Sequence, residues 1–349
     1  MTAKRNAASN IPAERKPPAS PASGAHAPTR RRRRMFVAAV LGLAALATVG
    51  ALAAVGTFIG HAAELTNCAA APSNCSYPGP ANTGVPAGTT LMSVPAQVSS
   101  GPGWYFNAAG GNVVVNVKGT VLSGLYIPYN LVISASNVTV KNVQVVTGGN
   151  FGISLTHTTG VTIENSTISG QNSTTGRVSY AIDDVYGDST GMTIKANNIS
   201  AFRTAVQMSA GLADGNYIHD PGYVAGDHTN GFYVNGGTAP LTIENNTIFD
   251  SLSQTDAINL DAGTPGPGAP VANKTIKNNL LAGGSYTIYG GAVSGSPTSN
   301  IIITGNRFGQ NYYSKSGQYG PVSYYNPKGT GNTWSGNSWD TTGQAISSP

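Results

Sequence analysis

The chain has 349 residues, of which 40% are hydrophobic and only 9% are charged, with 45 Gly and 21 Pro. This composition excludes a coiled coil and charge-driven disorder for most of the chain, and it predicts a sizeable buried core. The net charge of +5 is misleading, because nine of the 19 Lys and Arg lie in residues 1–34 and the chain from Glu64 onward carries ten basic against thirteen acidic residues, so we expect no nucleic-acid partner for the folded part.

The N-terminal region has two parts. Residues 1–34 are rich in Pro, Ala and Arg, end in the run Arg30 to Arg34, and are expected to form a disordered cytoplasmic tail. Residues 35–60 carry no charge. As a helix they would span roughly 39 Å, enough to cross a hydrocarbon core of about 30 Å. The Arg run predicts that the rest of the chain lies outside the cytoplasm.

Two interpretations of residues 35–60 stay open, an uncleaved membrane anchor and a cleaved signal peptide. The sequence favours the anchor, because Ala51-Leu52-Ala53 lies inside the apolar run and His61-Ala62-Ala63 is a poor cleavage site. The protein is therefore expected to be held at the membrane by this helix, or secreted if the helix is removed. Either way the domain that follows is extracytoplasmic.

Residues 61–99 are predicted to form a linker and an N-terminal cap that contains both cysteines. Cys68 and Cys75 could close one small loop by a disulfide, which would persist outside the cytoplasm. No His pair stands nearby at zinc-ligand spacing, so we expect no structural metal there.

A repeat dominates residues 100–340. Short apolar-x-apolar strands are followed by a polar turn and another apolar residue, and the period of 19 to 33 residues excludes a helix. The central apolar residues of the copies are Val140, Ile163, Ile194, Ala213, Ile243, Ile276 and Ile303.

Asparagines recur three positions after these central residues, at Asn197, Asn216, Asn246, Asn279 and Asn306. Stacked turns would place their amides in a ladder, each bonded to the turns above and below. This pattern is typical of a solenoid whose coils close against one another.

A second strand precedes each copy by about ten residues. Its apolar residues, which include Ile153, Ile182 and Phe232, are expected to point inward. Two-residue alternation then turns the next residues outward on one parallel sheet, about 4.8 Å apart per coil. These outward residues are the candidate substrate-binding groups Asp183, Gln207, Tyr233, Asn259 and Tyr289, with Arg203 just before its own strand.

The arrangement over residues 100–340 resembles the right-handed parallel β-helix proteins of the pectate-lyase-like superfamily. The segments around Cys75-Ser76-Tyr77-Pro78 and Trp334-Ser335-Gly336-Asn337 are similar to those of secreted bacterial β-helix proteins of unassigned activity. The resemblance implies an all-β right-handed solenoid that presents a sheet to a polysaccharide. Acid, amide and phenol groups suit sugar hydroxyls, and aromatic faces can cover the C–H side of a sugar ring.

One local cluster could carry chemistry. Asp227-His228-Thr229-Asn230-Gly231 and, one coil later, Asp256 weakly resemble the polygalacturonase pattern of acids on two successive coils. Asn230 stands where that pattern has its first Asp, and the Gly-His-Gly and Arg-Ile-Lys elements are missing.

Inverting hydrolysis needs two carboxyl groups roughly 6.5 to 9.5 Å apart. We therefore assign Asp256 as the general acid, Asp227 as the base and His228 as a neighbour that tunes protonation. The alternative is a Gly-rich turn with Asp caps. Asp183 lies three coils from Asp256, on the order of 14 Å, too far to pair with it. Asp184, which alternation turns inward, is expected to sit at a bulge that exposes it.

The sequence thus predicts a monomeric, extracytoplasmic, polysaccharide-active β-helix protein, with glycoside hydrolysis ahead of the other functions. A non-catalytic module that binds glycan or envelope polymer is the alternative. A polysaccharide lyase is the second alternative, disfavoured because Arg203 is the one cation near the sheet. No cofactor is expected, although oxygen ligands for Ca²⁺ are available at Asp183, Asp184 or Asp261. Residues 341–349 are expected to form a C-terminal tail.

Overall fold

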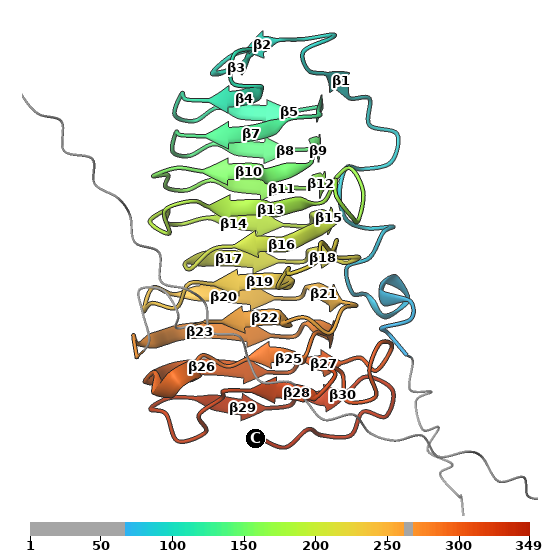
Figure 1. The fold of residues 1–349 in the computed structure, drawn as a ribbon, viewed down its shortest axis with the longest axis vertical. Helices are drawn as coiled ribbons and strands as arrows, with labels where there is room; N and C mark the ends of the chain where they lie inside the picture. Colours follow the sequence, from blue (N-terminus) through green and yellow to red (C-terminus); the bar gives the residue numbers. More distant parts are fainter. Residues whose placement is uncertain (1–66, 262–267) are drawn as a thin grey trace, which may run out of the picture. The chain divides into compact units, whose positions relative to one another are not determined.

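The computed structural model describes residues 67–261 and 268–349. In these ranges the chain is all-β apart from two 3-10 helices, η1 (Pro72–Cys75) and η2 (Val293–Gly295). Its strands form three sheets, and each successive coil adds one strand to each sheet (Figure 1). This confirms the prediction of stacked parallel strands, the arrangement expected of a β-helix.

The three sheets contain eleven, nine and ten strands of the described chain. The eleven-stranded sheet consists of β2 (Ser100–Gly101), β3 (Trp104–Asn107), β4 (Asn112–Val115), β7 (Asn130–Ile133), β10 (Gly149–Leu155), β13 (Val178–Asp184), β16 (Phe202–Gln207), β19 (Asn230–Val234), β22 (Asp256–Leu260), β25 (Tyr286–Tyr289) and β28 (Gly320–Ser323). The nine-stranded sheet consists of β5 (Val121–Ser123), β8 (Thr139–Lys141), β11 (Thr162–Glu164), β14 (Thr193–Lys195), β17 (Gly211–Asp214), β20 (Leu241–Glu244), β23 (Val271–Lys277), β26 (Thr298–Thr304) and β29 (Thr333–Ser335). The ten-stranded sheet consists of β1 (Met92–Ser93), β6 (Leu125–Ile127), β9 (Gln144–Val146), β12 (Thr167–Ser169), β15 (Asn198–Ser200), β18 (Tyr217–Ile218), β21 (Thr247–Asp250), β24 (Leu280–Gly283), β27 (Arg307–Phe308) and β30 (Ser338–Trp339).

The predicted register of the repeat is confirmed. The central residues from Val140 to Ile303 are ladder partners in the nine-stranded sheet, and they are buried. The second strand of each coil falls in the eleven-stranded sheet, where Ile153, Ile182 and Phe232 lie in one buried row.

A third strand in each coil was not predicted from the sequence. It forms the ten-stranded sheet, and its inward residues include Val145, Ile168, Ile199 and Ile248. The sequence indicated this strand only by the one apolar residue that follows each polar turn. A single apolar residue is too little to identify a strand by two-residue alternation.

The asparagine ladder is confirmed and is longer than predicted. The side-chain oxygen of each Asn accepts the backbone N–H of the preceding ladder position, from Ser166 to Asn306, and the ladder ends at Asn337. The residue before each ladder position adopts a left-handed backbone, as at Asn165 and Asn245, because the chain turns there between two sheets.

The eleven-stranded sheet bends at a row of small residues. An added Cβ at Gly231 would approach the Cγ2 of Ile248 to 2.4 Å, so this position faces the interior. The next residue, Phe232, is also buried. Two consecutive inward residues reverse the alternation, and Asn230 and Tyr233 therefore face outward on either side of them.

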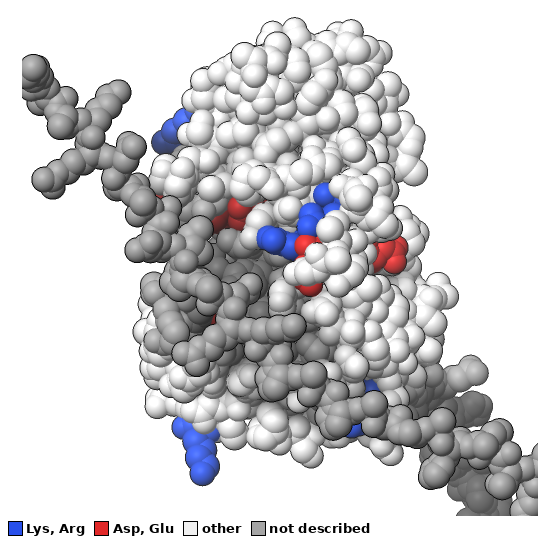
Figure 2. Space-filling view, viewed as in Figure 1, with Lys and Arg blue, Asp and Glu red and all other residues white. Residues whose placement is uncertain are grey.

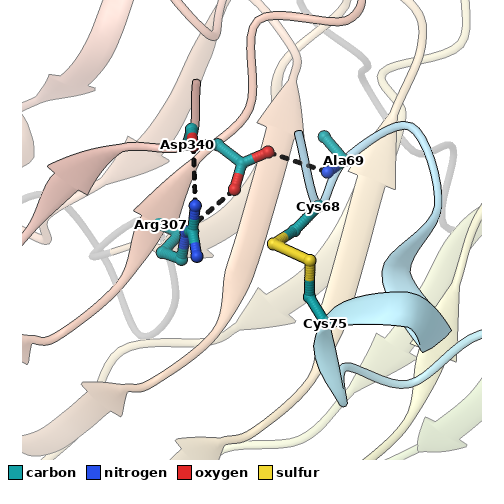
Figure 3. The surroundings of a disulfide bond; sticks show 5 residues. All are labelled: Cys68, Ala69, Cys75, Arg307 and Asp340. Atoms are coloured by element: carbon teal, nitrogen blue, oxygen red, sulfur yellow. Dashed lines mark hydrogen bonds and ion pairs between the residues drawn. A yellow bond between two sulfur atoms is a disulfide. The ribbon is translucent and has the colours of Figure 1, made fainter. Parts of the chain in front are cut away.

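The N-terminal segment runs along the ten-stranded sheet from the last coils toward the first (Figure 1). The Ala69 N–H donates to Asp340 Oδ2 at 2.8 Å, Gly84 N donates to Ala196 O, and β1 pairs with β6. Beside Ala69 the predicted disulfide joins Cys68 to Cys75, with Cα atoms 5.6 Å apart (Figure 3). We call residues 68–93 the N-terminal strap.

The far end of the stack is closed by aromatic side chains. Trp334 and Trp339 pack against the core, and the C-terminal tail covers them, since the Trp334 indole N–H donates to the carbonyl of Ile346 at 2.7 Å. The predicted tail 1–34 and membrane segment 35–60 lie outside the described residues. Within those residues we find no helix with the length and hydropathy needed to cross a membrane.

Candidate functional site

A groove of about 480 Å³ lies on the outer face of the eleven-stranded sheet, near the middle of the stack. Charged side chains of both signs gather at mid-height on this face, whereas most of the visible surface around them is uncharged (Figure 2). The groove is lined by Tyr180, Arg203, Thr204, Gln207, Gly226, Asp227, His228, Asn230, Tyr233 and Asn235.

Two outward rows of the sheet build the floor of the groove, one on each side of the bend. One row runs through the ladder partners Tyr180, Thr204, Asn230 and Asp256. The other is the row predicted from the sequence, Asp183, Gln207, Tyr233, Asn259 and Tyr289, and its register is confirmed. The first row was missed because strict alternation assigns its members to the interior.

Arg203 is the accessible cation of the groove. Its guanidinium lies 4.4 Å from the centre of the Tyr180 ring, and Phe151 stacks on the same Tyr180 ring with the two ring centres 6.0 Å apart. No hydrogen bond or ion pair joins the guanidinium to a described residue, so its fork of N–H donors is available to a ligand.

Asp183 is buried beside the groove, next to Gln207 in the ladder. Burial raises the pKa of Asp183 to about 7, the charge of Asp184 adds to the rise, and the charge of Arg203 opposes it. Its Oδ1 atom has no hydrogen-bond partner among the described residues. This carboxyl can therefore hold a proton near neutral pH.

Asp184 does not sit at a bulge, and that expectation was wrong. Leu155 and Asp184 are regular ladder partners, and Asp184 is 1% exposed. Both of its oxygens accept from the Ser189 N–H, at 3.3 and 3.2 Å. Burial nevertheless raises the pKa of Asp184, with these hydrogen bonds acting against the shift.

Asp227 lines the groove but is held in a structural arrangement. Arg177 donates to both of its oxygens, at 2.5 and 2.6 Å, and Val224 N donates at 2.8 Å. Burial alone would raise the pKa of Asp227, but these hydrogen bonds and the charges of Arg177 and Arg203 hold it below its ordinary value. An ionised carboxylate with three donors is a weak base, so the geometry favours a loop anchor over the predicted base.

Asp256 has no exposed surface. It is the ladder partner of Asn230, so it continues the outward row beyond the groove. Burial raises the pKa of Asp256 well above its usual range, and the nearby carboxyls of Asp250 and Asp261 add to the rise. A general acid must touch the glycosidic oxygen, and in this arrangement Asp256 is too deeply covered to do so.

His228 stands at the groove surface, and its Nδ1 lies 3.2 Å from the Thr255 hydroxyl. Thr255 directly precedes Asp256 in the sequence, but no hydrogen bond joins His228 to the buried Asp256 carboxyl. The structure thus brings Arg203, Gln207, Tyr233, Asp227 and His228 together around one groove. Asn259 and Tyr289 continue the predicted row beyond it.

Aromatic rings extend this row toward the end of the stack. Tyr289 contacts Tyr286 and Tyr324 with ring centres 5.9 and 5.4 Å apart, and Tyr286 contacts Tyr319 at 5.8 Å. Tyr319 and Tyr324 are exposed. Nearer the groove, the Tyr233 hydroxyl donates to Asp261 Oδ2 at 2.6 Å.

Two residues at the groove were missed by sequence reasoning. Tyr180 carries the stacked guanidinium, and Arg177 fixes Asp227 across 50 residues of sequence. Tyr180 had a weak signal in its place directly before the inward pair Ala181-Ile182 of β13, whereas the Arg177 contact depends on a loop path that local patterns do not encode. Across the described ranges, we find no group of three or more His, Cys, Asp or Glu side chains placed to hold a metal.

Comparison of the chain with protein-family models, with curated proteins and with solved structures gives no match.

Proposed function

We propose that this protein is an extracytoplasmic polysaccharide-active protein of the right-handed, pectate-lyase-like β-helix type, and that its groove binds an acidic glycan. The observation that carries the proposal is Arg203, a cation stacked on Tyr180 that has no hydrogen-bond or ion-pair partner among the described residues, in a groove that also presents Gln207 and Tyr233. A planar fork of donors suits a sugar carboxylate or a similar anion.

Hydrolysis is the reaction that the carboxyl groups favour. Asp183 holds its proton to about pH 7, whereas Asp227 stays ionised, and both lie close enough to Arg203 for its charge to lower their pKa values. A carboxyl that keeps its proton near neutral pH fits the role of proton donor, whereas Asp227 is held by Arg177 and Val224 N as a loop anchor, so we assign a proton donor and no base. We therefore assign the role of general acid to Asp183, which keeps 3% of its surface exposed and is the ladder partner of the groove residue Gln207, in place of Asp256, which has no exposed surface.

Retention of glycan without cleavage is the second candidate function. It is favoured by the three hydrogen bonds that occupy the Asp227 oxygens and by the complete burial of Asp256. Elimination remains a third candidate, and Arg203 would then neutralise the uronate carboxylate.

The test is to incubate the purified protein with a panel of neutral and uronate polysaccharides and to analyse retention and products by mass spectrometry. Asp183→Asn and Arg203→Gln are compared with a control, Lys328→Gln. This control removes one exposed positive charge from a residue that does not line the groove. We expect wild type and Lys328→Gln to retain uronate polymers about equally, and Arg203→Gln to lose tenfold or more in affinity.

Products that have gained water and that disappear in Asp183→Asn would support hydrolysis, and unsaturated products would support a lyase. Retention without products would identify a binding module. If no polymer is retained, or if Arg203→Gln binds as well as wild type, the proposed groove is not the binding site.

A further inference from the structure

Four oxygen atoms next to the groove are buried and have no hydrogen-bond partner among the described residues. They are Oδ1 and Oδ2 of Asp256 and the amide oxygens of Asn230 and Asn259. Their side chains are 0%, 6% and 7% exposed, respectively. Buried polar atoms are almost always hydrogen-bonded, and leaving one without a partner costs on the order of 1–3 kcal/mol, so four together need an explanation.

The three side chains are neighbours on two adjacent strands. Asn230 of β19 and Asp256 of β22 are ladder partners, and Asn259 follows Asp256 by three residues on β22. Asn259 approaches Asp256 closely enough to act against the rise of its pKa, but the geometry does not complete a hydrogen bond with either carboxylate oxygen. A half-turn about the last side-chain bond of Asn259 exchanges its amide oxygen and nitrogen.

The Asn230 amide has less freedom. Its Nδ2 donates to the carbonyl of His228 at 3.2 Å, which directs its oxygen away from that carbonyl. The site therefore combines one carboxylate with two amide oxygens, and all of these atoms accept hydrogen bonds. A single proton on Asp256 would supply one donor to this set and leave most of the acceptors without a partner.

A cation held by the Asp256 carboxylate and by the two amide oxygens, with the Asn259 amide turned, would give all four oxygens a partner, because each of them has a lone pair. Further negative charge lies nearby, since the Asp250 and Asp261 carboxyls both act electrostatically on Asp256. Asp250 already accepts from the Thr229 hydroxyl and from Leu252 N, and burial raises its pKa to about 8, so it is not counted as a ligand and the nearby negative charge is that of Asp261. Carboxylate and amide oxygens are the ligands of hard cations, and Ca²⁺ accepts irregular sets completed by water.

We propose that Asp256, Asn230 and Asn259 hold a Ca²⁺ ion between the coils of β19 and β22, as a structural site beneath the end of the groove. The carboxylate has no exposed surface, so the ion would fix the two coils and would not bridge to a substrate. The site does not depend on the proposed function, and it differs from the Ca²⁺ ligands considered from the sequence, because two of its three side chains are amides.

The test is thermal unfolding of the purified protein, stripped with a chelator and then titrated with CaCl₂, with MgCl₂ as the comparison. A ligand that binds only the folded state makes Tm rise with the logarithm of its free concentration. We expect that rise for Ca²⁺ in the wild type and its loss in Asp256→Asn. Asp220→Asn, which removes an exposed acid, should keep it.

Asp256→Asn is suited to this test because the amide removes a buried charge while keeping the shape, so the variant should fold without the ion. Asn230→Asp adds a second carboxylate to the set, and we expect it to bind Ca²⁺ at least tenfold more tightly and to be less stable than wild type after stripping. A wild-type Tm that does not change with Ca²⁺ would overturn the proposal, as would an equal response in Asp256→Asn. A response to Mg²⁺ as large as that to Ca²⁺ would also overturn the assignment of the ion.

Discussion

Asp183 shows how a single outward carboxyl acquires unusual chemistry from its neighbours. It occupies a regular ladder position between Ser154 and Gln207, and its backbone is ordinary. What changes its proton affinity is burial, followed by the adjacent charge of Asp184, and these outweigh the attraction of Arg203. The same residue type at Asp227 has the opposite shift, because Arg177 binds it directly.

The pKa of Asp183 predicts a pH dependence of stability. In the folded state the carboxyl keeps its proton to about pH 7, whereas in the unfolded chain it loses it near its ordinary value of about 4. The folded state therefore binds more protons between these values, and its contribution to the free energy of unfolding is lost as pH rises through this window. We expect Asp183→Asn to flatten the fall in Tm between about pH 4 and 7.

Parallel unfolding curves of wild type and Asp183→Asn over that window test this prediction. Asp250, whose pKa burial raises to about 8, is unchanged in both proteins, so their difference isolates Asp183. Equal slopes of Tm against pH would show that Asp183 is ionised in the folded state.

At the scale of elements, the asparagine ladder joins the turns of successive coils. Asn246 is a central member, because its oxygen accepts from the backbone of Asn216 and its Nδ2 donates to the carbonyl of Ala213. Asn337, at the end of the ladder, accepts from Asn306 and has no ladder member beyond it in the described chain. The side chains of the ladder thus tie each turn to the turns on both sides.

Asn246→Ala should lower the free energy of unfolding by about 2 to 4 kcal/mol, since it leaves buried backbone groups on two coils without partners. Asn337→Ala should cost less, because it interrupts the ladder on one side. Urea unfolding of both variants measures the difference. If the two variants are equally stable, the ladder does not act as a connected element.

Sequence periodicity predicted the strands whose apolar pattern repeats in every coil. It did not predict which residues face outward where the two-residue alternation is interrupted. Ile163 and Ile194 could be aligned because the turns between them have a constant chemistry. The outward position of Asn230 could not be predicted, because it depends on the bend at Gly231, where two consecutive residues face the core. The pairing of Asp227 with Arg177 was equally hidden, since 50 residues separate them.

On the scale of the whole molecule, the N-terminal strap connects coils that are far apart in the stack. At one end, Asp340 accepts from Ala69 N and pairs with the Arg307 guanidinium at 2.8 Å (Figure 3). Cys68 and Ala69 also pack against Phe249, Leu280 and Ala282. At the other end, β1 joins β6 in the first complete coils.

Replacing both cysteines by Ser should loosen the first end of the strap. Closing a loop with a sequence separation of 7 contributes about 2 to 3 kcal/mol in the chain-entropy model. We expect the Ala69 amide to exchange its hydrogen at least tenfold faster in the Cys68→Ser, Cys75→Ser variant, and faster again when Asp340→Asn is added. Exchange at β10 and β13 serves as the internal control, and unchanged exchange at Ala69 would show that the disulfide does not hold the strap.

The contact between Ala69 and Asp340 also sets an order of events. Its partners are 271 residues apart in sequence, so the strap emerges from the ribosome early and finds its last binding surface only when the final coil exists. The coils can stack one after another as they appear, but the contact of Ala69 with Asp340 must wait for the coil that ends at β30. A chain truncated before Asp340 would therefore lack the acceptor of the Ala69 N–H, and at this end the strap would keep its packing on Phe249 and Leu280.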